Sequence, residues 1–223
     1  MSNTIINYVP FNLNEQVLIR ESELIDQEYV YAKCPVHVHK QNRVFVGLSP
    51  MDFSLRVNKN TGGLPEIMCD YPEWIMWDEE HINSPTPVIQ LNFPKFMFYT
   101  SEDDVWFDFY DHPMTSLKNN FIAVRGWFNL SNWSRISSLG MTIVDETKPV
   151  IIKKGDPLYR ISFYPKNLDN IITMNEIKDP HKIGQLKQAY YDKTNAGWSD
   201  KSWKKLFSKT NDTSKCPVGF LFK

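Results

Sequence analysis

The sequence predicts a mainly β fold, α+β overall, with a sandwich-like or barrel-like core and a small helical appendage near the C-terminus. Three observations lead to this fold class. Aromatic residues, which favour strands, make up 14% of the 223 residues. Runs that alternate apolar and polar residues recur between turn-forming residues from position 29 onward. Helical patterns occur only after Asp179. At this length we expect one main domain with a full hydrophobic core.

Each predicted strand carries β-branched or aromatic residues and is bounded by turn formers. These segments are 29–39, 43–48, 52–57, 88–91, 95–100, 105–110 and 121–128. The clearest local pattern spans 150–163, where the tight turn Lys154-Gly155-Asp156-Pro157 joins two strand-like runs. This segment is predicted to form a β-hairpin.

Two helices are predicted after the strands. Asp179 and Pro180 match an N-cap and a first helical position, and Ser199 or Asp200 can begin a second helix. The apolar residues on the two buried faces are Ile183, Leu186 and Tyr190, and Trp203, Leu206 and Phe207. Both segments show the spacing of an amphipathic helix.

Composition divides the chain into three parts. We expect an N-terminal extension over 1–28, a β-rich core domain over 29–165 and a helical, basic C-terminal appendage over 166–223. From Lys178 onward the sequence holds ten Lys and four Asp, a charge of +6, so the net charge of -1 leaves -7 for the preceding part. This asymmetry favours an appendage that packs on the core.

The compartment is predicted from the cysteines and from the first residues. Cys34, Cys69 and Cys216 are odd in number and form no CxxC pair, which is typical of reduced thiols in a cytosol. Residues 1–11 lack a basic stretch followed by an apolar one, so we expect no secretion by a signal peptide and no membrane association. For a viral protein, the expected location is the host cytoplasm or the virion.

Two groups of residues offer metal or acid–base chemistry. His37 and His39 share one face of a predicted strand, which is the spacing of a two-histidine metal site, although two solvent-facing histidines give the same pattern. An acidic cluster runs from Glu102 to His112 and can serve as an acid–base pair, a cation site or a solvated loop. We expect no cofactor, and a divalent metal at the two histidines is the alternative.

Templates for common enzymes are absent. The chain contains no GxSxG elbow, no Walker motif and no GxGxxG loop, and none of the cysteines lies in a nucleophile motif. This absence favours a non-enzymatic function.

The segment 125–135 concentrates Arg125, Trp127, Trp133 and Arg135 in eleven residues. Arg and Trp are the residues that most often anchor interfaces, so these four are candidate binding residues. The other interpretation is a core corner in which both tryptophans are buried. Trp203, which lies among lysines, is a further candidate, but the near-zero total charge argues against nucleic-acid binding.

Several short motifs resemble a family of uncharacterised proteins encoded by tailed phages. They are Lys33-Cys34-Pro35, Val44-Phe45-Val46, Ser49-Pro50-Met51-Asp52-Phe53, the Trp/Arg segment and Lys154-Gly155-Asp156-Pro157-Leu158-Tyr159. The resemblance implies a phage origin. The segment 150–163 also resembles the late hairpin of dUTPase-like β-clip domains, which implies a β-clip or jelly-roll core. The phosphate-binding segment and the glycine-rich arm of those enzymes are absent, so no catalytic residue is carried over.

The leading hypothesis is a non-enzymatic phage protein whose β domain binds a virion protein, a host protein or itself through its aromatic and Arg-rich surface. The alternative is a small-molecule or nucleotide-binding enzyme of β-clip or double-stranded β-helix type. In that case Arg125 or Arg135 would hold an anion, and His37 and His39 would hold a metal.

Overall fold

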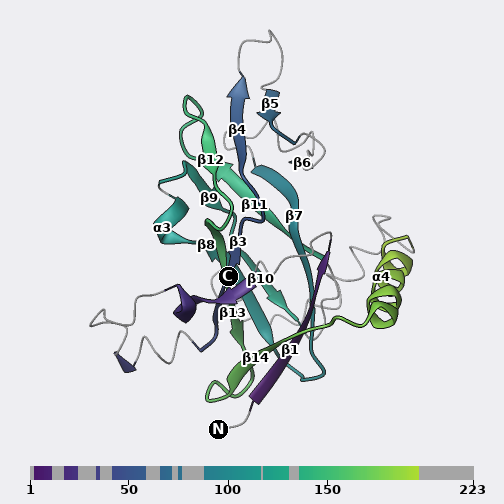
Figure 1. Ribbon diagram of the computed structural model, residues 1–223. Coiled ribbons are helices and arrows are strands. Elements are labelled where there is room, and N and C mark those ends of the chain that lie inside the picture. The colour runs from purple at the N-terminus through teal and green to yellow at the C-terminus, as the bar shows by residue number, and fades with distance from the viewer. Residues whose placement is uncertain are drawn as a thin grey trace, which may run out of the picture. The chain divides into compact units, whose positions relative to one another are not determined.

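The computed structural model describes residues 3–11, 18–24, 34–35, 42–58, 66–71, 75–76, 88–116, 118–130 and 136–195. The chain forms two compact units, Met1–Ile177 and Lys178–Lys223. The described strands all belong to the first unit, and helix α4 (Pro180–Asn195) belongs to the second (Figure 1). The boundary between the units coincides with the change from acidic to basic composition at Lys178.

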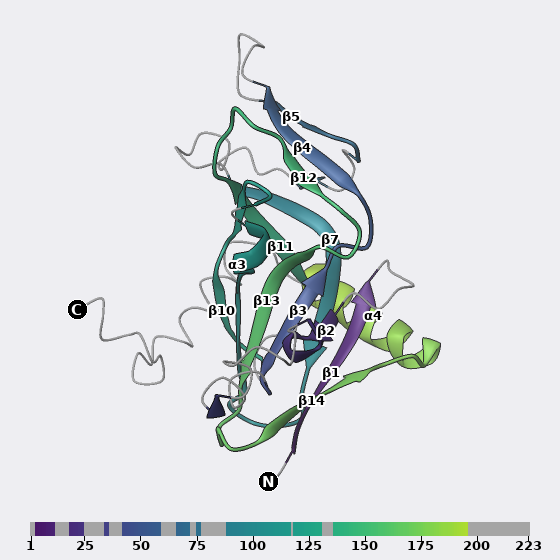
Figure 2. The same ribbon diagram turned by 60° about the vertical axis from the view of Figure 1, so that its left-hand side comes forward.

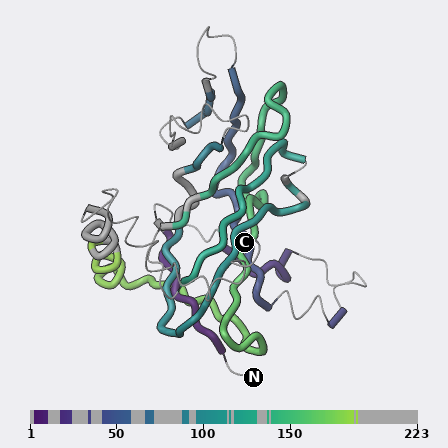
Figure 3. The backbone as a smooth tube through the Cα atoms, turned by 180° about the vertical axis from the view of Figure 1, so that it is seen from behind, coloured from purple at the N-terminus to yellow at the C-terminus, as the bar shows by residue number. Residues whose placement is uncertain are grey.

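Sheet A contains both ends of the first unit. Its order is β14 (Ile171–Glu176), β1 (Asn3–Phe11), β7 (Val88–Tyr99), β11 (Ile136–Ile143) and β9 (Phe121–Ala123), with β6 (Ile75–Met76) also paired to β7. Strand β1 pairs in parallel with β14 and antiparallel with β7. Figure 3 shows the purple β1 from behind, beside the teal β7. The first and last strands of the unit are therefore neighbours.

Sheets B and C are antiparallel. Sheet B has the order β10 (Gly126–Asn129), β8 (Trp106–Asp111), β13 (Pro157–Tyr164), β3 (Val44–Leu48) and β2 (Leu18–Arg20). Sheet C has the order β12 (Val150–Ile152), β4 (Phe53–Asn58) and β5 (Glu66–Cys69). The short helices η1 (Glu21–Glu23) and α3 (Pro113–Ser116) follow β2 and β8. Figure 2 shows sheet C above the ends of the other two sheets.

Sheets A and B form a β-sandwich whose core is rich in aromatic rings. Phe98 of sheet A meets Phe107 and Phe163 of sheet B, with ring centroids 5.9 and 5.6 Å apart. All three side chains are almost fully buried. Because successive residues of a strand point to opposite faces, the residues that alternate with Phe107 and Phe163 lie on the outer face of sheet B.

The predicted hairpin over 150–163 has its turn at the expected place, but its two strands do not pair with each other. β12 pairs with β4 in sheet C, whereas β13 pairs with β3 and β8 in sheet B. The turn between them carries Gly155 at a φ of +85°, which is a left-handed conformation that favours glycine. A two-stranded ribbon thus passes from sheet B to sheet C through two adjacent turns.

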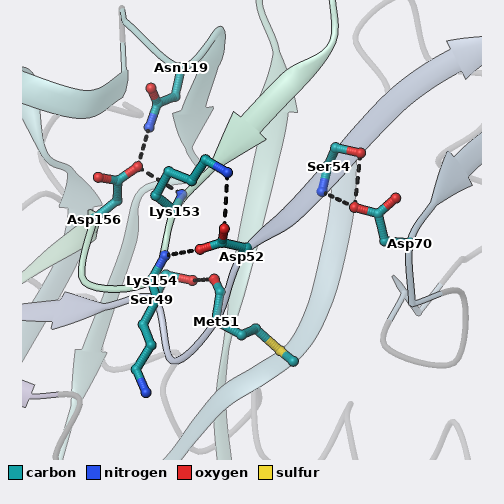
Figure 4. Close-up of polar contacts among 9 residues, drawn as sticks. All are labelled: Ser49, Met51, Asp52, Ser54, Asp70, Asn119, Lys153, Lys154 and Asp156. Atoms are coloured by element: carbon teal, nitrogen blue, oxygen red, sulfur yellow. Dashed lines mark hydrogen bonds and ion pairs between the residues drawn. The ribbon is translucent and has the colours of Figure 1, made fainter.

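Backbone and side-chain hydrogen bonds hold these two turns together (Figure 4). The Ser49 amide donates to the Asp156 carbonyl at 2.9 Å, and the Gly155 amide donates to the Ser49 carbonyl at 2.8 Å. The Asp52 carboxylate accepts from the Lys154 amide at 2.8 Å and from the Lys153 ammonium at 2.9 Å. These bonds satisfy the polar groups of the corner, which we interpret as a structural junction.

The predicted mainly β fold with a small C-terminal helix is confirmed, and several predicted strands match described ones. Segments 43–48, 52–57 and 105–110 correspond to β3, β4 and β8. The segments 88–91 and 95–100 join into the single strand β7, whose pairing with β11 shifts register between Ser137 and Leu139. This irregularity lies where Pro94, which cannot donate a hydrogen bond, interrupts the pattern.

Two predicted boundaries differ from the structure. The segment 121–128 is two strands in different sheets, because the chain leaves β9 of sheet A at Val124 and enters β10 of sheet B at Gly126. The compact unit extends beyond the predicted core of 29–165 at both ends, because β1 and β14 complete sheet A. The predicted strand 29–39 lies outside the described residues except for positions 34–35.

Helix α4 begins at the predicted capping residue. The Asp179 carboxylate accepts from the His181 amide at 2.9 Å, and the Asp179 carbonyl accepts from the Ile183 amide. Pro180 occupies the first helical position, where its missing N–H is tolerated. The predicted helix after Ser199 lies outside the described residues.

Candidate functional site

The outer face of sheet B carries a row of aromatic and polar side chains. Its members on the three neighbouring strands β10, β8 and β13 are Trp127; Trp106, Asp108 and Tyr110; and Arg160, Ser162 and Tyr164. In the register, Trp127 lies opposite Asp108, and Trp106 lies opposite Tyr164. Long-range strand pairing therefore brings residues from three parts of the chain to one surface.

Three rings on this surface form what we call the aromatic row: Trp106, Trp127 and Tyr164. The Trp106 and Trp127 rings are stacked, with centroids 5.9 Å apart and planes at 25°. The Trp127 and Tyr164 centroids are 4.9 Å apart, with planes at 39°. Since β8 separates the strands of Trp127 and Tyr164, these two rings meet above β8. Trp127 remains 40% exposed.

Arg125 lies next to the aromatic row at the crossing from β9 to β10 and binds a buried carboxylate. Its Nε and Nη2 atoms donate to Asp108 Oδ1 and Oδ2 at 3.2 and 2.7 Å. The Asp108 side chain is only 2% exposed, whereas that of Arg125 is 72% exposed. The hydrogen bonds and the negative charge of Asp108 raise the pKa of the Arg125 guanidinium. The bidentate pair neutralises Asp108 and fixes Arg125 beside the rings.

A second polar group occupies the same face farther along β8 and β13. Arg160 forms an ion pair with the buried Glu21 of η1, and its guanidinium lies 6.0 Å from the centre of the Tyr110 ring. The hydroxyls of Tyr110 and Ser162 share a hydrogen bond of 2.8 Å. Burial raises the pKa of Tyr110. These contacts link β8 and β13 to each other and to η1 through polar side chains.

His112 follows β8 at the end of this polar group. Its side chain is 3% exposed, and burial, reinforced by the positive charge of Arg160, lowers its pKa from 6.5 to about 4. The imidazole is therefore neutral at pH 7. A general base needs a pKa near the working pH and access to a substrate, and His112 has neither.

Two carboxylates of the predicted acidic cluster, Glu102 and Asp104, serve separate contacts with protein groups. Asp104 Oδ1 accepts from the Trp106 indole Nε1 at 2.9 Å. Glu102 instead accepts from the Thr4 hydroxyl at 2.8 Å and from the Ile5 amide, which anchors its turn to β1. Within the described part of the chain, no group of three or more His, Cys, Asp or Glu side chains is placed to hold a metal ion.

Of the residues predicted to bind, the structure brings Arg125 and Trp127 together on one exposed surface. Trp133, Arg135 and Trp203, and the proposed metal ligands His37 and His39, lie outside the described residues. The concentration of Arg and Trp in 125–135 did not identify Trp106, Asp108 and Tyr164 as members of the same surface. The alternation of side chains along 105–110 and along 157–164 indicates which residues share a face of each strand. It does not indicate which strands are neighbours in the sheet.

No protein-family model matches this sequence, and no curated protein matches it either. Among the described residues, no helix has the length and apolarity needed to cross a membrane.

The Arg125 side chain is expected to stabilise the fold although it is mostly exposed. Arg125→Ala should lower the free energy of unfolding by about 2 kcal/mol, because Asp108 would remain buried without a cation. Urea denaturation measures the change. The matched control is Lys153→Ala, which breaks an ion pair with Asp52 in which both side chains are more than half exposed and should cost less than about 1 kcal/mol. Equal losses in the two variants would contradict this assignment.

Proposed function

We propose that this chain is a phage-encoded, non-enzymatic recognition domain that binds another protein through the outer face of sheet B. The observation that carries the proposal is the aromatic row, in which the exposed Trp127 stacks on Trp106 and packs at a tilt against Tyr164. Trp, Tyr and Arg are the residues most enriched at the energetic centres of protein interfaces. All three types are present here: the Trp and Tyr rings contact one another, and Arg125 is bonded to Asp108, which lies opposite Trp127 in the register.

The rigidity of this surface supports the proposal. Trp106 and Tyr164 stand on β8 and β13, which each pair with a strand on both sides, and Trp127 stands on the edge strand β10, which pairs with β8. Opposite Trp127 in the register, the buried Asp108 holds Arg125 through two hydrogen bonds. Side chains that are already ordered lose little conformational entropy when a partner binds, so they contribute more to affinity.

The ion pair of Arg125 with Asp108 favours protein recognition over the enzyme alternative. Two of the five Arg125 N–H donors are bonded to Asp108, whose negative charge matches that of Arg125 and so leaves less of it to attract an anionic substrate. Glu102 and Asp104 each accept a hydrogen bond from a protein group, the Thr4 hydroxyl and the Trp106 indole. No specific observation supports a nucleotide site on this face.

Site-specific photo-crosslinking tests the proposal. A photoreactive phenylalanine derivative replaces Trp127 in one version of the full chain and Ile122 in the other. Ile122 is the matched control, because it is a similarly exposed apolar residue, 44% exposed, on β9 of sheet A. Both versions are irradiated in bacterial cells, with and without phage infection, and adducts are identified by mass spectrometry.

We expect position 127 to yield an adduct with one defined protein, from the virion, from the host or a second copy of this chain. Position 122 should yield much less of that adduct. An adduct of equal yield from both positions, or none from position 127, would overturn the proposal.

A further inference from the structure

We infer that the partner presents an arginine side chain to the aromatic row, with the acidic turn after β7 as its counter-charge. The inference rests on the proposed function and specifies the chemistry of the partner. Two features of the same surface carry it: the exposed Trp127 ring with its half-buried neighbours Trp106 and Tyr164, and the Asp104 carboxylate beside Trp106, which follows the exposed Asp103 in the turn.

The position of Asp104 links the acidic turn to the rings. Its carboxylate accepts the Trp106 indole N–H at 2.9 Å, so it lies at the edge of the aromatic row. Asp104 is held at a φ of 59°, in the left-handed region that aspartate tolerates. One hydrogen bond leaves the carboxylate able to accept further donors. Asp103, the preceding residue, is also exposed.

The turn that precedes Trp106 adds negative charge at one end of the row, and Arg43 adds positive charge within electrostatic range of Tyr164. Arg125 is the cation nearest to Trp127 in the sequence, but its charge is matched by the buried Asp108. Within the described residues, neither Asp103 nor Asp104 forms an ion pair with a lysine or arginine. The sequence preceding Lys178 carries a net charge of -7, so the wider field has the same sign. Charge complementarity therefore selects a basic partner segment.

Arginine suits this combination better than lysine. A guanidinium is planar, so it can stack on an indole face while its N–H groups form hydrogen bonds with a carboxylate. It is also more weakly hydrated than an ammonium group, which lowers the desolvation penalty of stacking. An Arg residue laid on the aromatic row with its donors toward Asp104 would use both features at once.

The test compares two small probes on the full chain. N-acetyl-arginine amide carries the guanidinium, and N-acetyl-citrulline amide is its neutral isostere. Binding is followed through the indole N–H signals in NMR spectra of the protein with 15N-labelled tryptophan. Trp106→Phe and Trp127→Phe variants assign the signals of the row.

We expect the arginine probe to shift the Trp106 and Trp127 signals in a saturable manner, and the citrulline probe to leave them in place. Asp104→Asn should weaken binding of the arginine probe by about threefold. This variant keeps an oxygen that can accept the Trp106 indole bond and removes only the charge. The matched control is Asp70→Asn on sheet C, where the acceptor for Ser54 is kept, and binding should not change.

The outcomes separate the two proposals. Equal shifts with both probes, no shift with either, or equal weakening by Asp104→Asn and Asp70→Asn would overturn the arginine inference. If Trp127 still crosslinks to one defined protein in such a case, the proposed function stands. Absence of that crosslink would overturn the proposed function whatever the probes show.

Discussion

Gly47→Ala is expected to lower the free energy of unfolding of the first unit by about 3 kcal/mol, because the new methyl group would overlap a buried ring. A Cβ atom at Gly47 would lie 2.2 Å from Tyr159 Cζ and 2.5 Å from its hydroxyl oxygen. Tyr159 cannot move aside easily, since it is 1% exposed and packs against Phe109 with ring centroids 5.0 Å apart. The backbone of β3 and the ring of β13 therefore require glycine at this position.

Urea denaturation of the purified chain measures this effect, with Gly140→Ala as the control. A Cβ atom at Gly140 would meet Val124 Cβ at 3.4 Å, an ordinary contact, so the change in stability should be small. Combining Gly47→Ala with Tyr159→Leu should give a smaller total loss than the sum of the single losses, because the shortened side chain relieves the overlap. Strict additivity of the two changes would contradict the steric explanation.

Lowering the pH from 7 to 4 is expected to remove about 3 kcal/mol of stability through His112 alone. Burial and the nearby Arg160 lower its pKa in the folded state to about 4, against the ordinary value of 6.5. Below pH 6.5 the unfolded chain gains a proton that the folded chain does not bind. Above pH 6.5 His112 therefore leaves the free energy of unfolding almost unchanged. As the pH falls from 6.5 toward 4, proton uptake by the unfolded chain lowers that free energy progressively.

His112→Gln isolates this contribution, because glutamine keeps a polar side chain that does not titrate. Denaturation curves recorded at pH 7, 5.5 and 4 should show a shallower loss of stability for the variant than for the wild type. His181→Gln is the control, since His181 is exposed on α4, and its pH dependence should match the wild type. An unchanged slope in His112→Gln would show that other groups dominate the acid response.

The parts of the fold that could be predicted are those specified by local pattern. Alternation of Phe53 and Leu55 with polar neighbours identifies β4, and Asp179 before Pro180 identifies the start of α4. In both cases the residues that specify the element lie within it or next to it. Secondary structure of this kind needs no knowledge of the tertiary fold.

The crossing between sheets at Arg125 could not be predicted, because the sequence over 121–128 is mostly apolar or aromatic and matches one continuous strand. The end of the part that belongs to sheet A is set by a contact with the distant strand β11, where the Val124 amide donates to the Gly140 carbonyl at 2.7 Å. The pairing of β12 with β4 rather than with β13 has a similar cause, since the turn at Gly155 is bonded to Ser49 of another turn. Non-local hydrogen bonds decide both outcomes.

Only part of the candidate site could be predicted, because the non-local pairing of strands also decides which residues meet there. Arg125 and Trp127 attract attention through their residue types alone. Their partners Asp108 and Tyr164 become partners only through the register of β8 with β10 and β13. Alternation shows that such residues share a face of their own strand, but it does not show which strands are adjacent.

The parallel pairing of β1 with β14 has a consequence for how the protein is made. Asn7 and Asn175 bond across this pair at 2.7 Å, although they are 168 residues apart. At typical rates of translation, β1 leaves the ribosome roughly 10 to 30 s before β14 is synthesised. One edge of β1 is unpaired during that interval and open to wrong strands from neighbouring nascent chains. Completion of sheet A is a late event of biosynthesis, and chaperone capture of the nascent chain would act mainly before it.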